Sequence, residues 1–174
     1  MNDSNGEYEI YVQQADGKGE IRQLGNFGGP HRMGLMWSPD SEKIATFQHD
    51  ARGGGMMYLT STQVGHAELD AWRGPLPEDT VIFRIERVVI HTDGSAPRVV
   101  RLQMPPDQHR STITDHIACG GTFCDVEWSP DGSQLAFVSS SRDHKEAILR
   151  VADPETGEVR DVLEERVDTF FESG

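Results

Sequence analysis

The sequence predicts an all-β protein, because one short phrase occurs twice and each copy runs into a small apolar strand. The phrase Trp-Ser-Pro-Asp stands at 37–40 and again at 128–131. An aliphatic residue followed by Ala comes at the same offset in the segments after them, 41–47 and 132–138. The copies lie about 90 residues apart, which is two of the roughly 40–50-residue periods of β-propeller blades. We therefore predict a partial β-propeller of four-stranded antiparallel blades.

The repeated phrase is itself a turn that joins two strands. Pro39 and Pro130 preset φ to about −65° at the second turn position, where a type I turn needs it. In the second copy Gly132 follows, and a type I turn followed by a left-handed Gly makes a hairpin with a bulge. Ser41 stands in place of this Gly in the first copy, and Ser adopts positive φ less readily. We expect the first turn to be the less ideal of the two.

Other β-hairpins are predicted around the two phrases. Three segments carry strand-like residues on either side of a turn that contains Gly or Pro: 8–24, 88–102 and 147–163. Together with the phrases they predict the outer hairpin of one blade over about 8–24, a complete blade over 35–102 and another over 124–163. The first complete blade carries an insertion at about 60–85.

The predicted blades are too few to close a ring. The chain supplies about two and a half blades, whereas propellers close with four to eight, which protects the edges of their sheets. We therefore expect this chain to be a fragment of a single, larger propeller domain.

The composition excludes two kinds of partner. The 174 residues contain 16 Lys and Arg against 29 Asp and Glu, a formal net charge of −13. Nucleic-acid binding needs a basic surface, and the most basic stretch, 84–101, is interrupted by Glu86 and Asp93. No apolar run approaches the ~20 residues of a membrane span, and the first residues do not resemble a signal peptide. We expect neither nucleic acid nor a membrane as a partner.

The two cysteines, Cys119 and Cys124, enclose a Gly-rich loop that follows His116. A zinc site needs four ligands, usually in closely spaced pairs, and no second Cys or His pair stands nearby. We therefore predict no metal and no cofactor. A local disulfide and two free thiols both remain open, because the choice depends on the redox compartment.

Catalytic motifs are missing from the sequence. It contains no Gly-x-Ser-x-Gly elbow, His-Glu-x-x-His pair, P-loop or dinucleotide fingerprint. The seven histidines show no mutual spacing that would pair a base with a nucleophile: His31, His49, His66, His91, His109, His116 and His144. We therefore assign no catalytic, cofactor-binding or metal-binding residue, leave the substrate-binding residues unknown, and expect no activity from this chain alone.

Three polar or exposed features are candidate sites. Glu164–Glu165 could capture an amine, but a solvated strand end is favoured because the pair follows a predicted outer strand. The charged segment 142–145 is predicted to be a surface turn between the second and third strands of a blade, with a central cavity as the alternative. The insertion, with Trp72, Pro75 and Pro77, could reach a substrate entrance or a second subunit. Packing over a neighbouring blade is favoured.

Longer stretches resemble a known family. The phrase with its following strand is similar to the repeat of dipeptidyl peptidase IV-type propellers and of TolB-type propellers. Further stretches resemble bacterial members of the dipeptidyl peptidase IV-like group of serine peptidases: 36–50, 57–59, 65–66, 72–77, 103–111 and 137–145. The resemblance runs from about residue 34 to the C-terminus.

The resemblance implies a non-catalytic propeller that caps a separate α/β-hydrolase domain and admits peptides by size. It implies a secreted or periplasmic serine exopeptidase, whose expected partners are its own downstream hydrolase domain, peptide substrates and a second copy in a homodimer. The triad of that family lies in the hydrolase domain, so no triad residue is expected here. The family's Glu-Glu amine site has no counterpart in 28–36, which holds no acidic residue. The alternative is a stand-alone TolB-like propeller that binds a protein.

Overall fold

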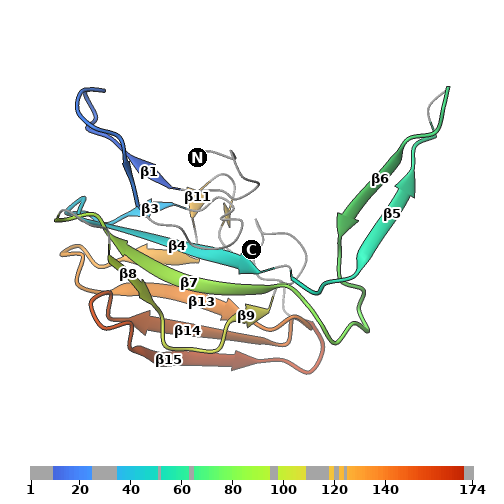
Figure 1. Ribbon diagram of the computed structural model, residues 1–174. Helices are drawn as coiled ribbons and strands as arrows, with labels where there is room; N and C mark the ends of the chain where they lie inside the picture. Colours follow the sequence, from blue (N-terminus) through green and yellow to red (C-terminus); the bar gives the residue numbers. More distant parts are fainter. Residues whose placement is uncertain are drawn as a thin grey trace.

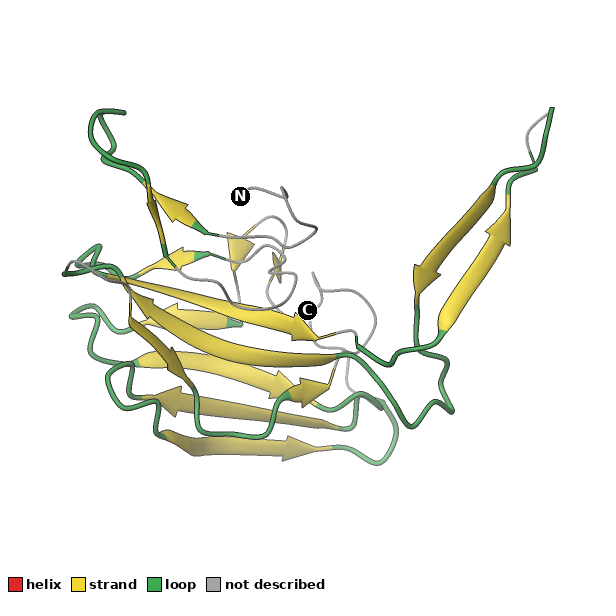
Figure 2. Cartoon of the chain, in the orientation of Figure 1, coloured by secondary structure: helices red, strands yellow, loops and turns green. Residues whose placement is uncertain are grey.

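The computed structural model describes residues 10–24, 35–50, 52–62, 65–94, 98–108, 118–119, 122–123 and 125–170. Every regular element in these residues is a β-strand, and every strand pair is antiparallel (Figures 1 and 2). The described part of the chain therefore holds no helix that could span a membrane. The predicted all-β class is confirmed.

The first blade is a sheet of five strands. Its strands are β3 (Met36–Trp37), β4 (Lys43–Asp50), β7 (Arg84–His91), β8 (Arg98–Arg101) and β9 (Asp107–Gln108). The order is β3-β4-β7-β8, and β9 pairs with the beginning of β7, so two short strands share the outer edge of the blade. The last five of the eight residues of β7 are all buried, as expected for a central strand that is covered on both faces.

The second blade is a sheet of four strands joined in sequence order. It comprises β12 (Val126–Trp128), β13 (Leu135–Ser140), β14 (Glu146–Ala152) and β15 (Val159–Arg166). Along β13 buried and half-buried residues alternate, because one face of this sheet lies against the first blade. The last strand continues to Arg166, beyond the predicted limit at 163, because its pairing with β14 extends as far as Glu146.

Two short hairpins accompany the blades. Strands β1 (Tyr11–Val12) and β2 (Arg22–Gln23) pair within the predicted hairpin 8–24. Strands β10 (Ala118–Cys119) and β11 (Thr122–Phe123) pair just before the second blade. The question of a disulfide falls outside the described residues, because Cys124 is not among them.

The insertion is a separate β-hairpin that begins earlier than predicted. Strand β5 (Met56–Thr60) pairs with β6 (Leu69–Arg73), and the blade resumes at Arg84, so the insertion covers the whole connection between β4 and β7 rather than only 60–85. Figure 1 shows this hairpin projecting away from the two blades. All residues of β6 are exposed, so the favoured prediction that the insertion packs over a neighbouring blade is wrong for its two strands.

The two Trp-Ser-Pro-Asp phrases form the turns predicted for them. The amides of Ser41 and Gly132 each donate a 2.9 Å hydrogen bond to the carbonyl oxygen three residues earlier. The φ angles are 60° at Ser41 and 69° at Gly132. Only Gly adopts this conformation without a steric penalty, so the first turn is the less favourable, as predicted.

The core lies between the two blades, which pack face to face. Its fully buried members come from both sheets: Ala45, Val89, Leu102, Trp128, Leu135, Phe137 and Ala152. The opposite face of the first blade is covered by the β1–β2 hairpin, where Ile10 and Leu24 pack against Ile44 and Ile90. Each blade is thus stabilised by its neighbours, as in a propeller.

Candidate functional site

Most residues considered from the sequence are not brought together by the fold. His91 is buried between the blades, His144 lies in the β13–β14 loop and His66 is exposed near the tip of the insertion. The side chain of His49 and all of His31, His109 and His116 lie outside what the structure describes. Glu164 and Glu165 are exposed in β15, inside the strand rather than at its end. Among the described residues, no group of three or more His, Cys, Asp or Glu side chains could hold a metal ion.

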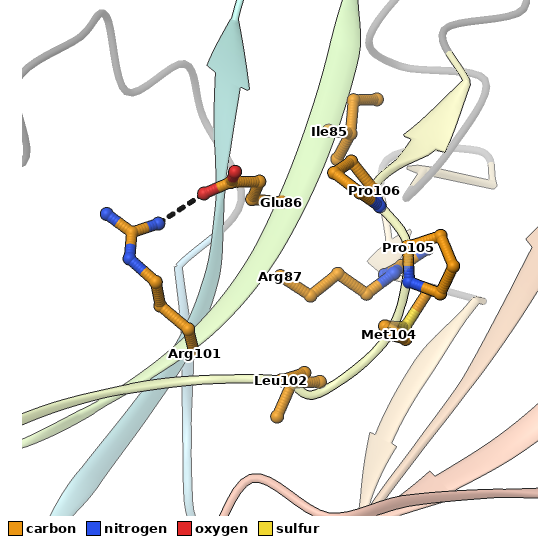
Figure 3. A pocket seen from close by; sticks show the side chains of 8 residues that line it. All are labelled: Ile85, Glu86, Arg87, Arg101, Leu102, Met104, Pro105 and Pro106. Carbon is orange, nitrogen blue, oxygen red and sulfur yellow. Dashed lines mark hydrogen bonds and ion pairs between the residues drawn. The ribbon is translucent and has the colours of Figure 1, made fainter.

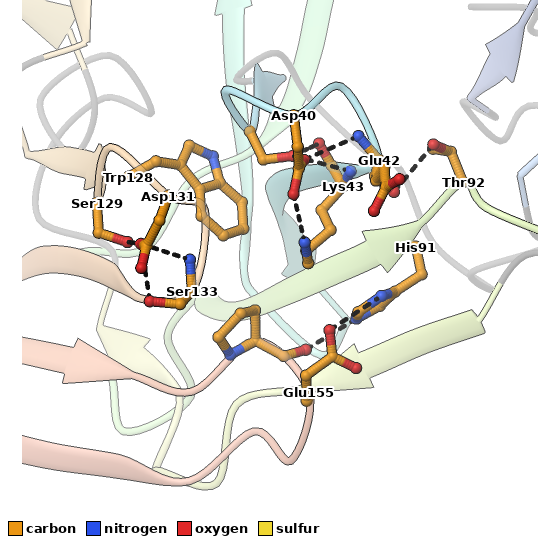
Figure 4. Close-up of polar contacts among 12 residues, drawn as sticks. Asp40, Glu42, Lys43, His91, Thr92, Trp128, Ser129, Asp131, Ser133 and Glu155 are labelled. Atoms are coloured by element: carbon orange, nitrogen blue, oxygen red, sulfur yellow. Dashed lines mark hydrogen bonds and ion pairs between the residues drawn. The ribbon is translucent and has the colours of Figure 1, made fainter.

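His91 joins the two blades at the end that carries the Trp-Ser-Pro-Asp turns, here called the turn end (Figure 4). Its Nε2 donates to the Pro154 carbonyl oxygen in the second blade at 2.9 Å. Its Nδ1 accepts a 3.0 Å hydrogen bond from Nη2 of Arg98. Arg98 also donates to the Glu155 carbonyl oxygen at 3.0 Å and pairs with the Glu155 carboxylate. His91 is therefore used as a structural link.

The acidic residues of the two phrases hold their own turns. The Asp40 carboxylate accepts a 2.8 Å bond from Lys43 Nζ and further bonds from Ser38 Oγ and the Glu42 amide, which hold its pKa well below the usual range. Asp131 accepts bonds from Ser129 Oγ at 2.6 Å and from the hydroxyl and amide of Ser133, which lower its pKa to about 2 (Figure 4). Both carboxylates stay ionised and serve the turns rather than a reaction.

The two tryptophans of the repeat have different surroundings. Trp128 is 8% exposed and donates through Nε1 to the Met36 carbonyl oxygen of the first blade at 3.2 Å. Trp37 is 45% exposed. Of the two equivalent tryptophans, Trp128 therefore contributes to the contact between the blades, whereas Trp37 remains exposed.

A buried ion pair of the first blade contacts the second blade nearer the opposite end, here called the loop end. Arg87 Nε donates to Asp107 at 2.8 Å, and both side chains are almost fully buried. The same guanidinium donates to the Val138 carbonyl oxygen at 2.9 Å and lies 4.6 Å from the centre of the Phe137 ring. A cavity of about 130 Å³ lies beside it, between β7 and the loop that carries Pro105 and Pro106 (Figure 3). Arg150 Nη1 of the second blade also lies 3.8 Å from the Asp107 carboxylate, so both members of the pair contact the second sheet.

A larger groove, of about 710 Å³, opens at the loop end. Its walls come from three segments: Pro75 and Pro77 at the base of the insertion, Gln108 in β9, and 141–143 in the β13–β14 loop. Arg142 ties these parts together, because its Nη2 donates to the Leu76 carbonyl oxygen at 2.7 Å. The segment 142–145 is the surface turn predicted from the sequence. Among the hydrogen bonds described for the insertion, only the bond from Arg142 to Leu76 connects it to the next blade.

No pattern in the sequence predicts this groove. Pro75 and Pro77 belong to the predicted insertion and Arg142 and Asp143 to a predicted turn, but nothing in their spacing indicates that they meet. Gln108 belongs to a stretch that resembles the family, 103–111, and has no predicted role in a site. Only the packing of the first blade on the second places these side chains around one space.

The comparison with protein families decides the relationship. Residues 31–174 match the family model described as the dipeptidyl peptidase IV N-terminal region. The chain belongs to this family. A search of curated proteins found no significant match.

Two solved structures share the fold. The crystal structure of a dipeptidyl aminopeptidase IV, described as putative, from Bacteroides ovatus is 18% identical, with a TM-score of 0.64, over 87% of this chain and 22% of that one. Porphyromonas gingivalis dipeptidyl peptidase 4 is 10% identical, with a TM-score of 0.67, over 93% of this chain and 24% of that one. The chain therefore spans less than a quarter of the length of these two proteins, and at such identities the likeness concerns the fold.

Proposed function

We propose that this chain is the non-catalytic propeller portion of a dipeptidyl peptidase IV-like serine exopeptidase. In this role it docks the α/β-hydrolase domain of the parent protein and restricts access to peptide substrates. The observation that carries the proposal is the family match over 31–174, together with blades that stack face to face. The match favours this role over a TolB-like protein-binding propeller.

In this proposal the propeller has a structural role and the hydrolase domain carries out catalysis. The polar side chains between the blades are engaged in structural contacts, as His91 and Arg87 illustrate. The nucleophile, its base and the oxyanion site then belong to the hydrolase domain. We further propose a periplasmic or secreted location for the parent, as the family resemblance implies.

Peptidase assays on two proteins test this role. The full-length protein is expected to cleave a dipeptidyl reporter, and replacement of the Ser in a Gly-x-Ser-x-Gly elbow of its hydrolase domain is expected to abolish cleavage. The 174-residue chain alone is expected to release no product. Cleavage by the chain alone, or a full-length protein without such an elbow, would contradict the proposal.

We also propose that the projecting hairpin of β5 and β6 contacts a second copy of the protein. Several large apolar side chains of this hairpin are exposed to solvent: Met56, Tyr58, Leu59, Leu69 and Trp72. Exposed apolar surface of this kind is typical of interaction sites. A homodimer would bury it.

A further inference from the structure

The groove at the loop end is lined by two residues of opposite charge. Arg142 and Asp143 both line it. Among the described residues neither takes part in an ion pair, although many other charged side chains do. Although they are adjacent in sequence, the two side chains make separate hydrogen bonds, and both line the same groove.

Each charge is fixed in place by the fold. The Arg142 guanidinium is anchored by its 2.7 Å bond to the Leu76 carbonyl oxygen, and within the described residues this bond uses one of its five N–H donors. The Asp143 carboxylate is anchored by a 2.6 Å bond from Ser141 Oγ, which holds its pKa below the usual range and keeps it ionised. A carboxylate offers about four acceptor positions, so it retains the capacity to bind a cation. Both groups are thus preorganised for a ligand.

The remaining walls suit a peptide. Pro75 and Pro77 supply rigid apolar surface, and the side chain of Gln108 makes no hydrogen bond within the described part of the chain, so its amide can both donate to and accept from a peptide group. The volume of about 710 Å³ lies within the range of small-ligand pockets.

From this arrangement we propose that the groove binds short peptides with free termini. The Arg142 guanidinium binds the C-terminal carboxylate of the peptide, and the Asp143 carboxylate binds its N-terminal ammonium group. Guanidinium groups bind carboxylates through parallel hydrogen bonds, and an ammonium group pairs best with an ionised acceptor. A ligand that carries only one of the two charges leaves the other groove charge without a partner. The inference goes beyond the proposed function, because it assigns a ligand site to residues of the propeller itself.

Calorimetric titration of the purified chain with trialanine tests this site. Four forms are compared: free at both ends, acetylated, amidated, and blocked at both ends. Since hydrogen bonds to charged groups contribute about 1.5–3 kcal/mol, we expect blocking either end to weaken binding about tenfold. Equal affinity for all four forms, or no binding of the free peptide, would overturn the proposal.

Two substitutions separate the roles of the termini. In Arg142→Gln the preference for a free carboxylate is expected to vanish, while the preference for a free amine remains. In Asp143→Asn the reverse is expected, because an amide oxygen can still accept from Ser141. Arg160→Gln removes a positive charge from an exposed site at the turn end of β15 and is expected to leave all four affinities unchanged. If the two groove variants bind all four peptides as the wild type does, the assignment is wrong.

This outcome is independent of the proposed peptidase role. Binding is measured on the chain without a hydrolase domain, so the peptidase assays can succeed while the groove proves empty, and the reverse can also occur. Near-ultraviolet circular dichroism of each variant shows whether its fold is retained, and an Arg142→Lys variant provides a milder change that keeps the charge.

Discussion

At the scale of single residues, close contacts between the blades restrict which side chains can stand at the turns. Gly157 has a φ of 78°, and a Cβ atom built on it would lie 2.5 Å from the Arg101 carbonyl oxygen. Gln103 donates its amide to the Gly157 carbonyl oxygen at 2.7 Å, so the turn cannot easily move away. Gly94 has the same φ but no atom within 4 Å of its built Cβ.

We predict that Gly157→Ala destabilises the chain more than Gly94→Ala. Both substitutions place Ala at positive φ, which costs about 1–2 kcal/mol. Only Gly157→Ala adds a clash with backbone, so its total cost is expected to reach about 3 kcal/mol. Urea unfolding followed by tryptophan fluorescence measures both, and equal midpoints would show that the turn can retreat from Arg101.

A pH dependence follows from the turn carboxylate of Asp131. Its pKa is lowered from 3.8 to about 2 by bonds from Ser129 and Ser133, so the folded state binds its proton less readily than the unfolded state does. The stabilisation is therefore fully present above pH 4 and is lost as the pH falls toward 2.

We predict a smaller loss of stability between pH 5 and pH 2.5 in Asp131→Asn and in Ser129→Ala than in the wild type. The first variant removes the titrating group, and the second removes the hydroxyl that lowers its pKa most. Urea midpoints at the two pH values give the comparison. A variant that loses as much stability as the wild type would show that this turn contributes nothing to acid unfolding.

At the scale of elements, the joint between the sheets combines apolar packing with a buried ion pair. The Arg87 and Asp107 side chains are 6% and 5% exposed. They belong to β7 and β9 of the first blade, yet Arg87 also reaches the backbone and a ring of β13. Removing one partner leaves the other charged and buried, which is costly, whereas removing both need not be.

We predict that Asp107→Ala lowers the free energy of unfolding by about 3–5 kcal/mol. The double substitution of Arg87→Met with Asp107→Leu is expected to recover most of this loss, because it replaces both charges with apolar groups. Arg150, which lies 3.8 Å from Asp107, keeps its ion pair with Asp161 in the double variant. Denaturant titrations of the wild type, the single variants and the double variant measure the coupling. Additive effects would mean that the two side chains do not act as a pair.

Among the elements, the sequence predicted the turns most accurately, because their conformation depends on local residue chemistry. The turns at 38–41 and 129–132 were predicted with their positive φ, because Pro and Gly restrict the backbone directly. The insertion was placed at about 60–85 but begins before Met56, because β5 could equally have continued the blade. Strand pairing chooses between such partners, and pairing is a property of the tertiary structure.

At the scale of the whole molecule, stacked blades carry a projecting arm. The arm strands β5 and β6 bury little surface within the described part of the chain, and Leu59 and Leu69 are 59% and 62% exposed. A hairpin of two strands is marginally stable alone, so a partner that covers it would also stabilise it.

We predict that the full-length protein sediments as a dimer and that the double substitution Leu59→Ser with Leu69→Ser shifts it toward monomer. The polar side chains remove apolar area from the proposed contact. Leu163→Ser is the matched control, because Leu163 is also 62% exposed but lies on the outer strand β15. A monomeric wild type, or an unchanged double variant, would contradict the role of the arm.

The sequence by itself determined the two repeated turns, the doubled blade unit and the main hairpins of the blades, because these depend on the φ preferences of Pro and Gly and on apolar periodicity. It could not determine that Trp128 is buried while Trp37 stays open, since the two share the same local context. Nor could it show that Leu76 and Arg142, which are 66 residues apart in the chain, are joined by a hydrogen bond beside the groove. Only the packing of one blade on the next decided those neighbours, because burial and contact across sheets arise from the whole chain.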